Sequence, residues 1–183
     1  EYEDIVSTQI DVAFEIVESP IEELNGAYAV IWTTTPWTIP VNQALAYGPE
    51  VDYRIVEWEG KKLLIAESLV TAAWYRLRGW KKTTTVSDET GPYLEIVEYN
   101  ESEPLPLGLK VKGADLAGTI VRHPMHHLGG FFAKPRPMLP GDFVTTDSGT
   151  GLVHMSPDHG EDDFDLCKAN GIDPVFAVEG DGK

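Results

Sequence analysis

The most informative segment of this chain reads Trp32-Thr33-Thr34-Thr35-Pro36-Trp37-Thr38-Ile39-Pro40. The apolar residues 27–31 before it are typical of a strand that is buried on both faces. Because Pro36 has no backbone N–H for a sheet and restricts the residue before it, we expect the strand to end at the threonines. Threonine hydroxyls and free backbone N–H groups would then lie beside two aromatic rings, an arrangement that suits a nucleoside. The alternative is a strand end whose threonines only cap a turn.

A second informative segment, Gly149-Thr150-Gly151-Leu152-Val153-His154-Met155-Ser156-Pro157-Asp158-His159-Gly160-Glu161-Asp162-Asp163-Phe164, follows toward the end of the chain. In this order, the two segments resemble the two motifs of the editing (CP1) domain that is inserted into isoleucyl-tRNA synthetases. The related valyl and leucyl enzymes usually carry Thr-Thr-Arg-Pro in place of Thr-Thr-Thr-Pro-Trp. Thr35 and Trp37 therefore favour the isoleucyl branch of this class I aminoacyl-tRNA synthetase family.

The length of 183 residues suits a single domain, 1–183, and a hydrophobic content of 42% is enough to build a core. The acidic start of the chain, without Met, is unlike a signal peptide and agrees with an excised insertion of a larger synthetase. No apolar run approaches the length of a membrane span, so we expect no membrane contact. The single cysteine, Cys167, excludes an internal disulfide and agrees with a reducing, cytoplasmic location.

The formal net charge of −16 is unusual for a protein that handles nucleic acid, because phosphate contacts from basic residues supply most of the affinity in such proteins. If the resemblance holds, the isolated domain should bind tRNA weakly. The catalytic body of the parent synthetase would then have to present the acceptor end of the tRNA to it.

Many short strands and only two clear helices predict a mainly β fold. Strands are predicted at residues 8–16, 27–33, 44–47, 51–55, 63–65, 81–87, 93–99, 119–121, 143–146 and 152–155, and helices at 68–78, with Ser68 as N-cap, and 161–170. The resemblance implies the fold of the Val/Ile/Leu-tRNA synthetase editing domains, and we expect a closed or partly open β-barrel with peripheral helices. The role of residues 86–104 stays open. Residues 129–140 are expected to form a loop that, with Lys134 and Arg136, is the best candidate for a phosphate-facing segment.

Editing in this family hydrolyses the ester that joins a wrong amino acid, chiefly valine, to isoleucine tRNA. An apolar pocket separates ligands that differ by one methylene by only about 10–200-fold, and valine against isoleucine in these synthetases is the usual example. A second pocket that admits valine but excludes isoleucine supplies the missing discrimination. Such a site needs contacts for the terminal adenosine and for the α-ammonium, a wall that limits side-chain size, and a positioned water.

The resemblance implies that the catalytic residues are Thr33, Thr35, His154 and Asp163. As a carboxylate, Asp163 would bind the α-ammonium; its alternative role is to favour a helix N-terminus. His154 would limit side-chain size and contact the water, or else be a satisfied core histidine. Thr33 and Thr35 lie two apart on an extended chain and so share one side, where they would hold the ribose, the adenine and the water.

The substrate-binding residues implied by the resemblance are Trp32, Thr34, Trp37, Asn42 and Gly151. Among these, Trp37 would form an apolar wall and Asn42 would lie at the pocket rim. No nucleophilic triad is visible, so we expect catalysis by positioning of a water, assisted by the ribose hydroxyl of the substrate. Histidines cluster at residues 123–127 and 154–159, but prolines interrupt the spacing that zinc sites show. We therefore predict neither a metal nor a cofactor.

The predicted function is hydrolytic editing of mischarged Val-tRNA for isoleucine by an aminoacyl-tRNA deacylase domain. The predicted partners are the valine-bearing acceptor end of isoleucine tRNA and the catalytic body of the parent synthetase, with the fragment itself a monomer. Two alternatives stay open: a non-catalytic module that binds the acceptor end, and the editing domain of a valyl or leucyl enzyme.

Overall fold

The computed structural model describes residues 9–77, 83–88, 91–96 and 105–175. Nine strands form one mixed sheet, which in spatial order contains β11 (Leu152–Met155), β3 (Ala44–Tyr47), β10 (Arg136–Pro140), β9 (Ile120–Arg122), β1 (Ile10–Glu18), β2 (Tyr28–Thr33), β5 (Lys61–Ala66), β4 (Asp52–Trp58) and β8 (Leu107–Lys112). The described α-helices are α1 (Val70–Leu77) and α2 (Glu161–Ala169). Short 3-10 turns are η1 (Glu22–Leu24), η2 (Pro36–Val41), η3 (Glu67–Leu69), η4 (Gly113–Leu116), η5 (His126–Leu128) and η6 (Gly130–Ala133).

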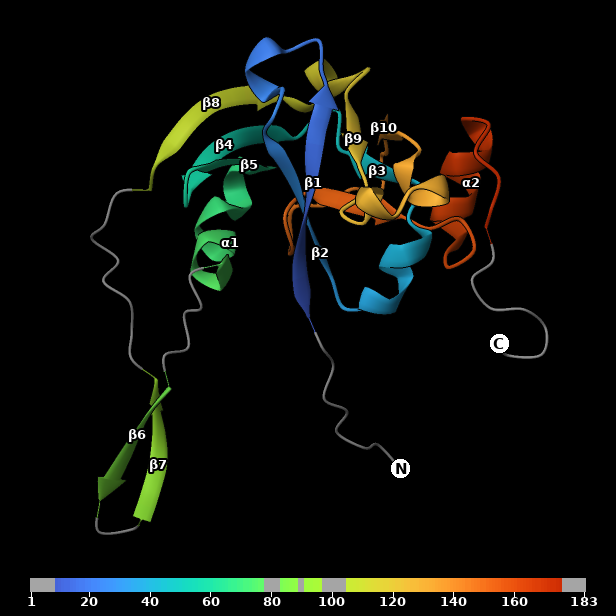
Figure 1. The fold of residues 1–183 in the computed structure, drawn as a ribbon. Coiled ribbons are helices and arrows are strands. Elements are labelled where there is room, and N and C mark those ends of the chain that lie inside the picture. The colour runs from blue at the N-terminus through green and yellow to red at the C-terminus, as the bar shows by residue number, and fades with distance from the viewer. Residues whose placement is uncertain (1–8, 78–82, 89–90, 97–104, 176–183) are drawn as a thin grey trace, which may run out of the picture.

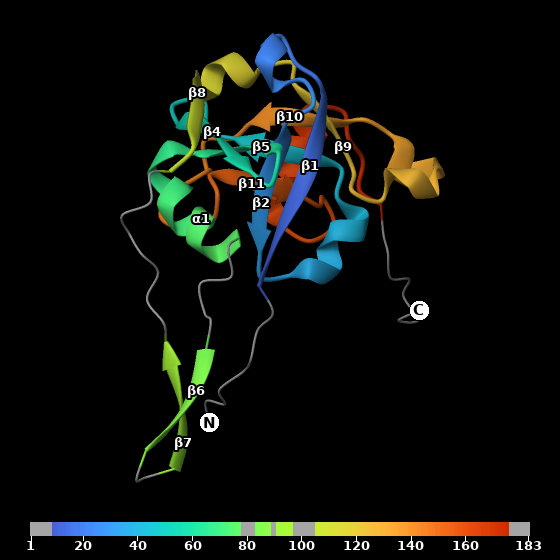
Figure 2. The same ribbon diagram turned by 60° about the vertical axis from the view of Figure 1, so that its left-hand side comes forward.

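The sheet is curved and mostly antiparallel, with parallel pairings of β2 with β5 and of β3 with β10 (Figures 1 and 2). The predicted mainly β fold with few helices is confirmed, but of the predicted closed or partly open barrel the closed form is excluded, because the edge strands β11 and β8 do not pair with each other and the sheet is open. The reason lies in the segment before β11. Its Thr150 carbonyl accepts the Ala66 N–H at 2.8 Å and its Gly151 carbonyl accepts the Tyr53 hydroxyl at 2.6 Å, so a loop rather than a strand ladder meets β4 and β5.

Two hydrophobic clusters share strand β3, because alternate side chains of a strand point to opposite faces. Leu45 and Tyr47 belong to the main core, which also contains the fully buried Phe14, Ile31 and Leu64. The other face of β3 contributes to a smaller cluster whose buried members are Ala44, Ala46, Leu139, Val144, Met155 and Cys167. Cys167 lies on α2, so this smaller cluster is where α2 packs beside β3 and β11.

Most predicted elements exist, with shifted ends. The buried strand before the threonines is β2, with both faces largely buried, and the predicted second helix is α2. The first strand begins at Ile10 and ends at Glu18, later than predicted. The first helix is preceded by the turn η3, so Ser68 lies inside that turn and is not an N-cap. The predicted pair at 81–87 and 93–99 is confirmed by β6 (Thr83–Asp88) and β7 (Gly91–Ile96), which among the described strands form a separate two-stranded sheet; residues 81–82 and 97–99 lie outside the described residues.

Two predicted elements are wrong. Residues 136–140, expected within a loop, form β10, and its pairings with β9 and β3 are only two and three residues long, so its prolines break few hydrogen bonds. Residues 143–146, expected as a strand, begin within a turn, in which the Val144 N–H approaches the Gly141 carbonyl at 3.4 Å, and are not assigned to a strand. Among the described residues, no helix has the length and hydrophobicity that a membrane crossing requires.

Candidate functional site

The threonine segment forms a tight, self-capped turn between β2 and η2. The Thr35 backbone N–H donates to Thr33 Oγ1 at 3.0 Å, and the Thr38 hydroxyl donates to the Thr35 carbonyl at 2.8 Å. Thr33 Oγ1 and Thr35 Oγ1 lie 3.2 Å apart, which confirms that these two side chains share one side. Thr33 is buried, Thr34 is half-buried and Thr35 is exposed. The threonines therefore cap a turn and still present a hydroxyl row that reaches the surface.

His154 lies on β11, where it is paired with Leu45 of β3. Its Nε2 is 2.9 Å from Thr38 Oγ1, and its Nδ1 is 3.4 Å from Asn42 Nδ2. Burial lowers the pKa of His154 to about 4, and the nearby His159 and His123 act in the same direction. The imidazole is therefore neutral at neutral pH, and the threonine turn and β11 meet through it.

Asp163 lies in the first turn of α2 and points back toward the end of β11. Its Oδ2 accepts the Ser156 backbone N–H at 2.8 Å, and among the described residues its Oδ1 has no hydrogen-bond partner. Burial raises the pKa of Asp163 and the neighbouring Asp162 adds to this, whereas the Ser156 N–H and His159 lower it. A half-buried carboxylate with one open oxygen is suited to a cationic ligand.

Thr38 and Ser156 connect the two motifs, and sequence reasoning assigned a role to neither. The Thr38 hydroxyl contacts His154, and the Thr38 carbonyl accepts the Ser156 hydroxyl at 3.0 Å. Ser156 in turn binds Asp163. The signal that was present is the spacing of Thr38 three residues after Thr35, which suits a turn in which the hydroxyl returns to the Thr35 carbonyl.

The remaining predicted binding residues occupy several environments. Asn42 is 0% exposed and donates to the Ala44 carbonyl at 2.8 Å, so it contacts His154 from beneath rather than forming an open rim. Trp37 is 68% exposed beside the threonine turn. Trp32 lies in β2 next to Thr33 in the chain and so faces the other side of the strand, where the Arg76 guanidinium lies 5.9 Å from its ring centre.

Gly151 has a structural reason to be glycine. Its φ of +76° lies in the left-handed region, and a Cβ there would be 2.4 Å from the Cβ of Ala66. Because its carbonyl binds Tyr53, this residue fixes the approach of β11 to the β4–β5 hairpin. The structure therefore brings together Thr33, Thr35, His154 and Asp163 through Thr38, Asn42 and Ser156, while Trp32 and Gly151 lie behind them.

The prediction that residues 129–140 face a phosphate with Lys134 and Arg136 stays a prediction for Lys134 and is wrong for Arg136, which is 1% exposed. Its Nε donates to the Asn42 carbonyl and its Nη1 to the Phe131 carbonyl, both at 3.0 Å, and its guanidinium lies 4.6 Å from the Phe131 ring centre. Burial lowers the pKa of Arg136 to about 10. Arg136 thus holds the backbone beneath the site, while Lys134 is exposed.

The histidine clusters do not form a metal site in the described part of the chain, where no group of three or more His, Cys, Asp or Glu could hold an ion. His123 is fully buried: its Nε2 is 2.8 Å from the Ile39 carbonyl, and its Nδ1 accepts the Met125 N–H at 3.0 Å. The contact with the Ile39 carbonyl connects the buried His123 ring to η2. His159 Nε2 lies 3.4 Å from Asp158 Oδ2.

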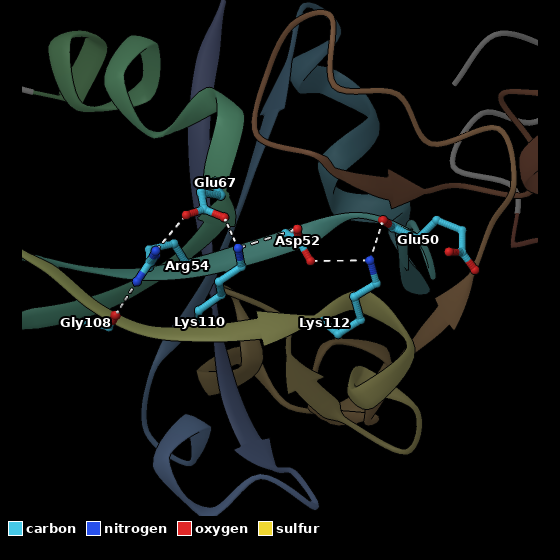
Figure 3. A network of polar contacts seen from close by, with 7 residues as sticks. All are labelled: Glu50, Asp52, Arg54, Glu67, Gly108, Lys110 and Lys112. Atoms are coloured by element: carbon cyan, nitrogen blue, oxygen red, sulfur yellow. Dashed lines mark hydrogen bonds and ion pairs between the residues drawn. The ribbon is translucent and has the colours of Figure 1, made fainter.

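Two hollows lie away from the threonine turn. One, of about 370 Å³, is lined by Glu50, Val51, Asp52, Glu67, Ser68 and Thr146. Figure 3 shows the ionic network beside it, in which Glu67 binds Arg54 at 2.6 Å and Lys110 at 2.9 Å. Because these charges pair with one another across η3, β4 and β8, the network holds the edge strand β8 rather than presenting free charge.

The other hollow, of about 420 Å³, lies between η1 and β8 and is lined by Pro20, Ile21, Glu23, Leu109, Lys110, Val111 and Asp115.

Comparison with known proteins confirms the resemblance carried by the two motifs. The chain is 51% identical over its 183 residues to the isoleucine–tRNA ligase of Zymomonas mobilis, and 44% identical over 195 aligned residues to that of Gluconobacter oxydans. In both cases the whole chain is matched, but it spans only 17% and 18% of the relative's length. No protein-family model matches the chain.

The fold is that of known editing domains. The chain superposes on the crystal structure of GlLeuRS-CP1 with a TM-score of 0.56 at 19% identity, covering 78% of this chain and 43% of that one. It also superposes on the editing domain of the cytosolic leucyl-tRNA synthetase of P. knowlesi with a TM-score of 0.53 at 12% identity, covering 91% and 66% of the two chains.

Proposed function

Because the whole chain is homologous to one segment of isoleucine–tRNA ligases, we propose that it is the editing domain of such an enzyme and hydrolyses Val-tRNA for isoleucine. The observation that carries this proposal is the set of hydrogen bonds by which Thr38 and Ser156 connect the threonine turn to His154 and Asp163. An aminoacyl ester has a cationic end, a small side chain and a reactive carbonyl. The site offers a chemically matched group to each.

The role of Asp163 is to bind the α-ammonium of the attached amino acid. Its Oδ2 is oriented by Ser156, which leaves Oδ1 for the ligand. A charge-assisted bond of this kind orients the ester as well as holding it, because the ammonium is one bond away from the carbon that carries the ester carbonyl.

Thr33 and Thr35 hold the attacking water and the terminal ribose through the hydroxyl row. The water attacks the ester carbonyl carbon, the bond to the ribose oxygen breaks, and that oxygen leaves with a proton. Neutral His154 limits the size of the side chain that can enter, and the exposed ring of Trp37 supplies an apolar surface beside it. With no free base among these residues, the ribose hydroxyl of the substrate assists proton transfer.

The parent synthetase supplies what this acidic domain lacks, since a net charge of −16 repels tRNA phosphates. We place the domain in the cytoplasm, as a monomeric unit to which the catalytic body delivers the acceptor end. The test is to compare deacylation of Val-tRNA and Ile-tRNA for isoleucine by this chain and by the complete synthetase.

Loss of valine with isoleucine spared supports the proposal, in either protein. Binding of both tRNAs without hydrolysis by the complete synthetase would overturn it and favour a module that only holds the acceptor end. Equal hydrolysis of both tRNAs would support an esterase activity but contradict the size limit that is assigned to His154.

A further inference from the structure

The two ring nitrogens of His154 are both engaged by neighbouring side chains. Nε2 lies 2.9 Å from the Thr38 hydroxyl and Nδ1 lies 3.4 Å from the Asn42 amide nitrogen. A neutral imidazole carries one proton, on one of its two nitrogens, and the partner of each nitrogen decides which one carries it.

The position of that proton follows from counting donors. The Thr38 hydroxyl has a single hydrogen, and it is directed to the Thr35 carbonyl at 2.8 Å. With that hydrogen given to the Thr35 carbonyl, Thr38 Oγ1 is an acceptor toward His154, which favours the proton on Nε2. The Asn42 amide has two hydrogens, one directed to the Ala44 carbonyl at 2.8 Å, which leaves the other for Nδ1 as an acceptor.

We propose that Thr38 is a positioning residue of the editing site, which holds His154 as one neutral tautomer with its hydrogen on Nε2 and its ring in one orientation. Asn42 completes the arrangement at Nδ1. The inference rests on the proposed function, because it says how the size-limiting side chain of that site is held in place.

This arrangement assigns His154 a passive role in the chemistry. Its only lone pair, on Nδ1, faces a buried amide that is 0% exposed, so the ring does not take a proton from the attacking water. What it offers to the substrate is a rigid ring. Rigidity matters, because a ring that can turn aside would make room for the extra methylene of isoleucine, which a pocket already distinguishes only weakly.

Removing the Thr38 hydroxyl should loosen this wall. In Thr38→Val the side chain keeps its shape, but Nε2–H loses its acceptor. A lost bond of this type corresponds to about a tenfold change in an equilibrium, so we expect the preference for Val-tRNA over Ile-tRNA to fall by roughly tenfold. Thr38→Ser keeps the hydroxyl and is the matched control, with its preference expected to stay within about twofold of wild type.

The decisive measurement is long-range ¹H–¹⁵N NMR of the His154 ring in this 183-residue chain at neutral pH. The His154 signals are identified by their loss in His154→Asn. We expect a protonated Nε2 and an unprotonated Nδ1 in wild type and in Thr38→Ser, and averaged or exchanged nitrogen shifts in Thr38→Val. If Thr38→Val does not give a folded spectrum, the same nitrogen shifts are measured in Thr38→Ala, which also lacks the hydroxyl but has a smaller side chain.

The outcomes separate the two proposals. A hydrogen on Nδ1 in wild type, or unchanged shifts when the Thr38 hydroxyl is removed, would overturn the role of Thr38. The expected shifts in a chain that fails to deacylate Val-tRNA, even within the complete synthetase, would leave the role of Thr38 in positioning His154 standing and remove the proposed function.

Discussion

The carboxylate of Asp163 accepts the backbone N–H of Ser156 at 2.8 Å, which ties the first turn of α2 to the residue that directly follows β11. One oxygen of the carboxylate is thereby oriented and the other is left for a ligand. Helix position alone does not require this contact, since an acidic residue anywhere in the first turn would favour the helix. The contact is specific to Asp163 and leads to the first prediction.

Asp163→Asn should lower the rate of Val-tRNA deacylation by roughly 10- to 100-fold, because a hydrogen bond to a charged group contributes more than a neutral one. The amide oxygen can still accept the Ser156 N–H, so the fold should be retained. Asp165→Asn, an exposed carboxylate on the same helix, is the matched control and should leave the rate unchanged. Equal losses in both variants would show that α2 acts only through its overall charge.

His154 should make the stability of the domain depend on pH. Its pKa is about 4 in the folded state against an ordinary value of 6.5, so the unfolded chain binds more protons between these values. The contribution of neutral His154 to the free energy of unfolding is therefore fully present above about pH 6.5. It is lost as the pH drops toward 4, by an amount on the order of 2–3 kcal/mol. The check is urea unfolding at pH 7 and pH 5, in wild type and in His154→Gln, in which this part of the loss should disappear.

The same pKa predicts that His154 contributes no inflection near pH 6.5 to the rate of deacylation. A histidine that acted as a general base with its ordinary pKa would produce one. Measuring kcat/KM for Val-tRNA from pH 5.5 to pH 7.5 decides between the two, once the decay of the ester without enzyme is subtracted. An inflection that is absent from His154→Gln would contradict the neutral, hydrogen-bonded ring.

Gly151→Ala should destabilise the domain by about 3 kcal/mol or more, because the new methyl group would overlap Ala66 and the backbone is in the left-handed region. Gly171→Ala is a matched control, since Gly171 has a similar φ of +73° but nothing within 4 Å of the new Cβ. It should cost only about 1 kcal/mol. Similar losses at the two positions in urea unfolding would mean that contact with Ala66 is unimportant.

Arg136→Met should destabilise the domain by about 2–4 kcal/mol, because its buried guanidinium satisfies carbonyl groups that would lose their donors. Lys134→Met, at an exposed position two residues earlier, should change stability by less than about 0.5 kcal/mol. The comparison also tests the original expectation for this segment. Weaker tRNA binding by Arg136→Met with unchanged stability would return Arg136 to the phosphate-facing role that its burial excludes.

The sequence predicted local features well. The end of β2 at the threonines, the shared side of Thr33 and Thr35, and α2 beginning at Glu161 all follow from proline, strand alternation and first-turn acidic residues. These signals act over a few residues and do not depend on the rest of the chain.

Contacts between distant segments were not predictable in the same way. Thr38 and His154 are separated by 116 positions, so no periodicity connects the hydroxyl to the ring. Arginine is usually exposed, so the sequence alone predicts Arg136 at the surface, and its burial depends on the carbonyl groups of Asn42 and Phe131 that accept its hydrogen bonds. The open sheet likewise depends on how the loop before β11 meets β4 and β5.

The position of β3 between β10 and β11 has a consequence for synthesis of the protein. Residues 44–47 leave the ribosome before either of their strand partners, both of which lie after residue 135. The threonine turn must therefore wait for most of the chain before His154 and Asp163 can join it, and pairings over such separations form slowly. A nascent chain that stops before α2 therefore contains the threonine turn but lacks Asp163, so the contacts that join the threonine turn to α2 form only after residues 161–169 are made.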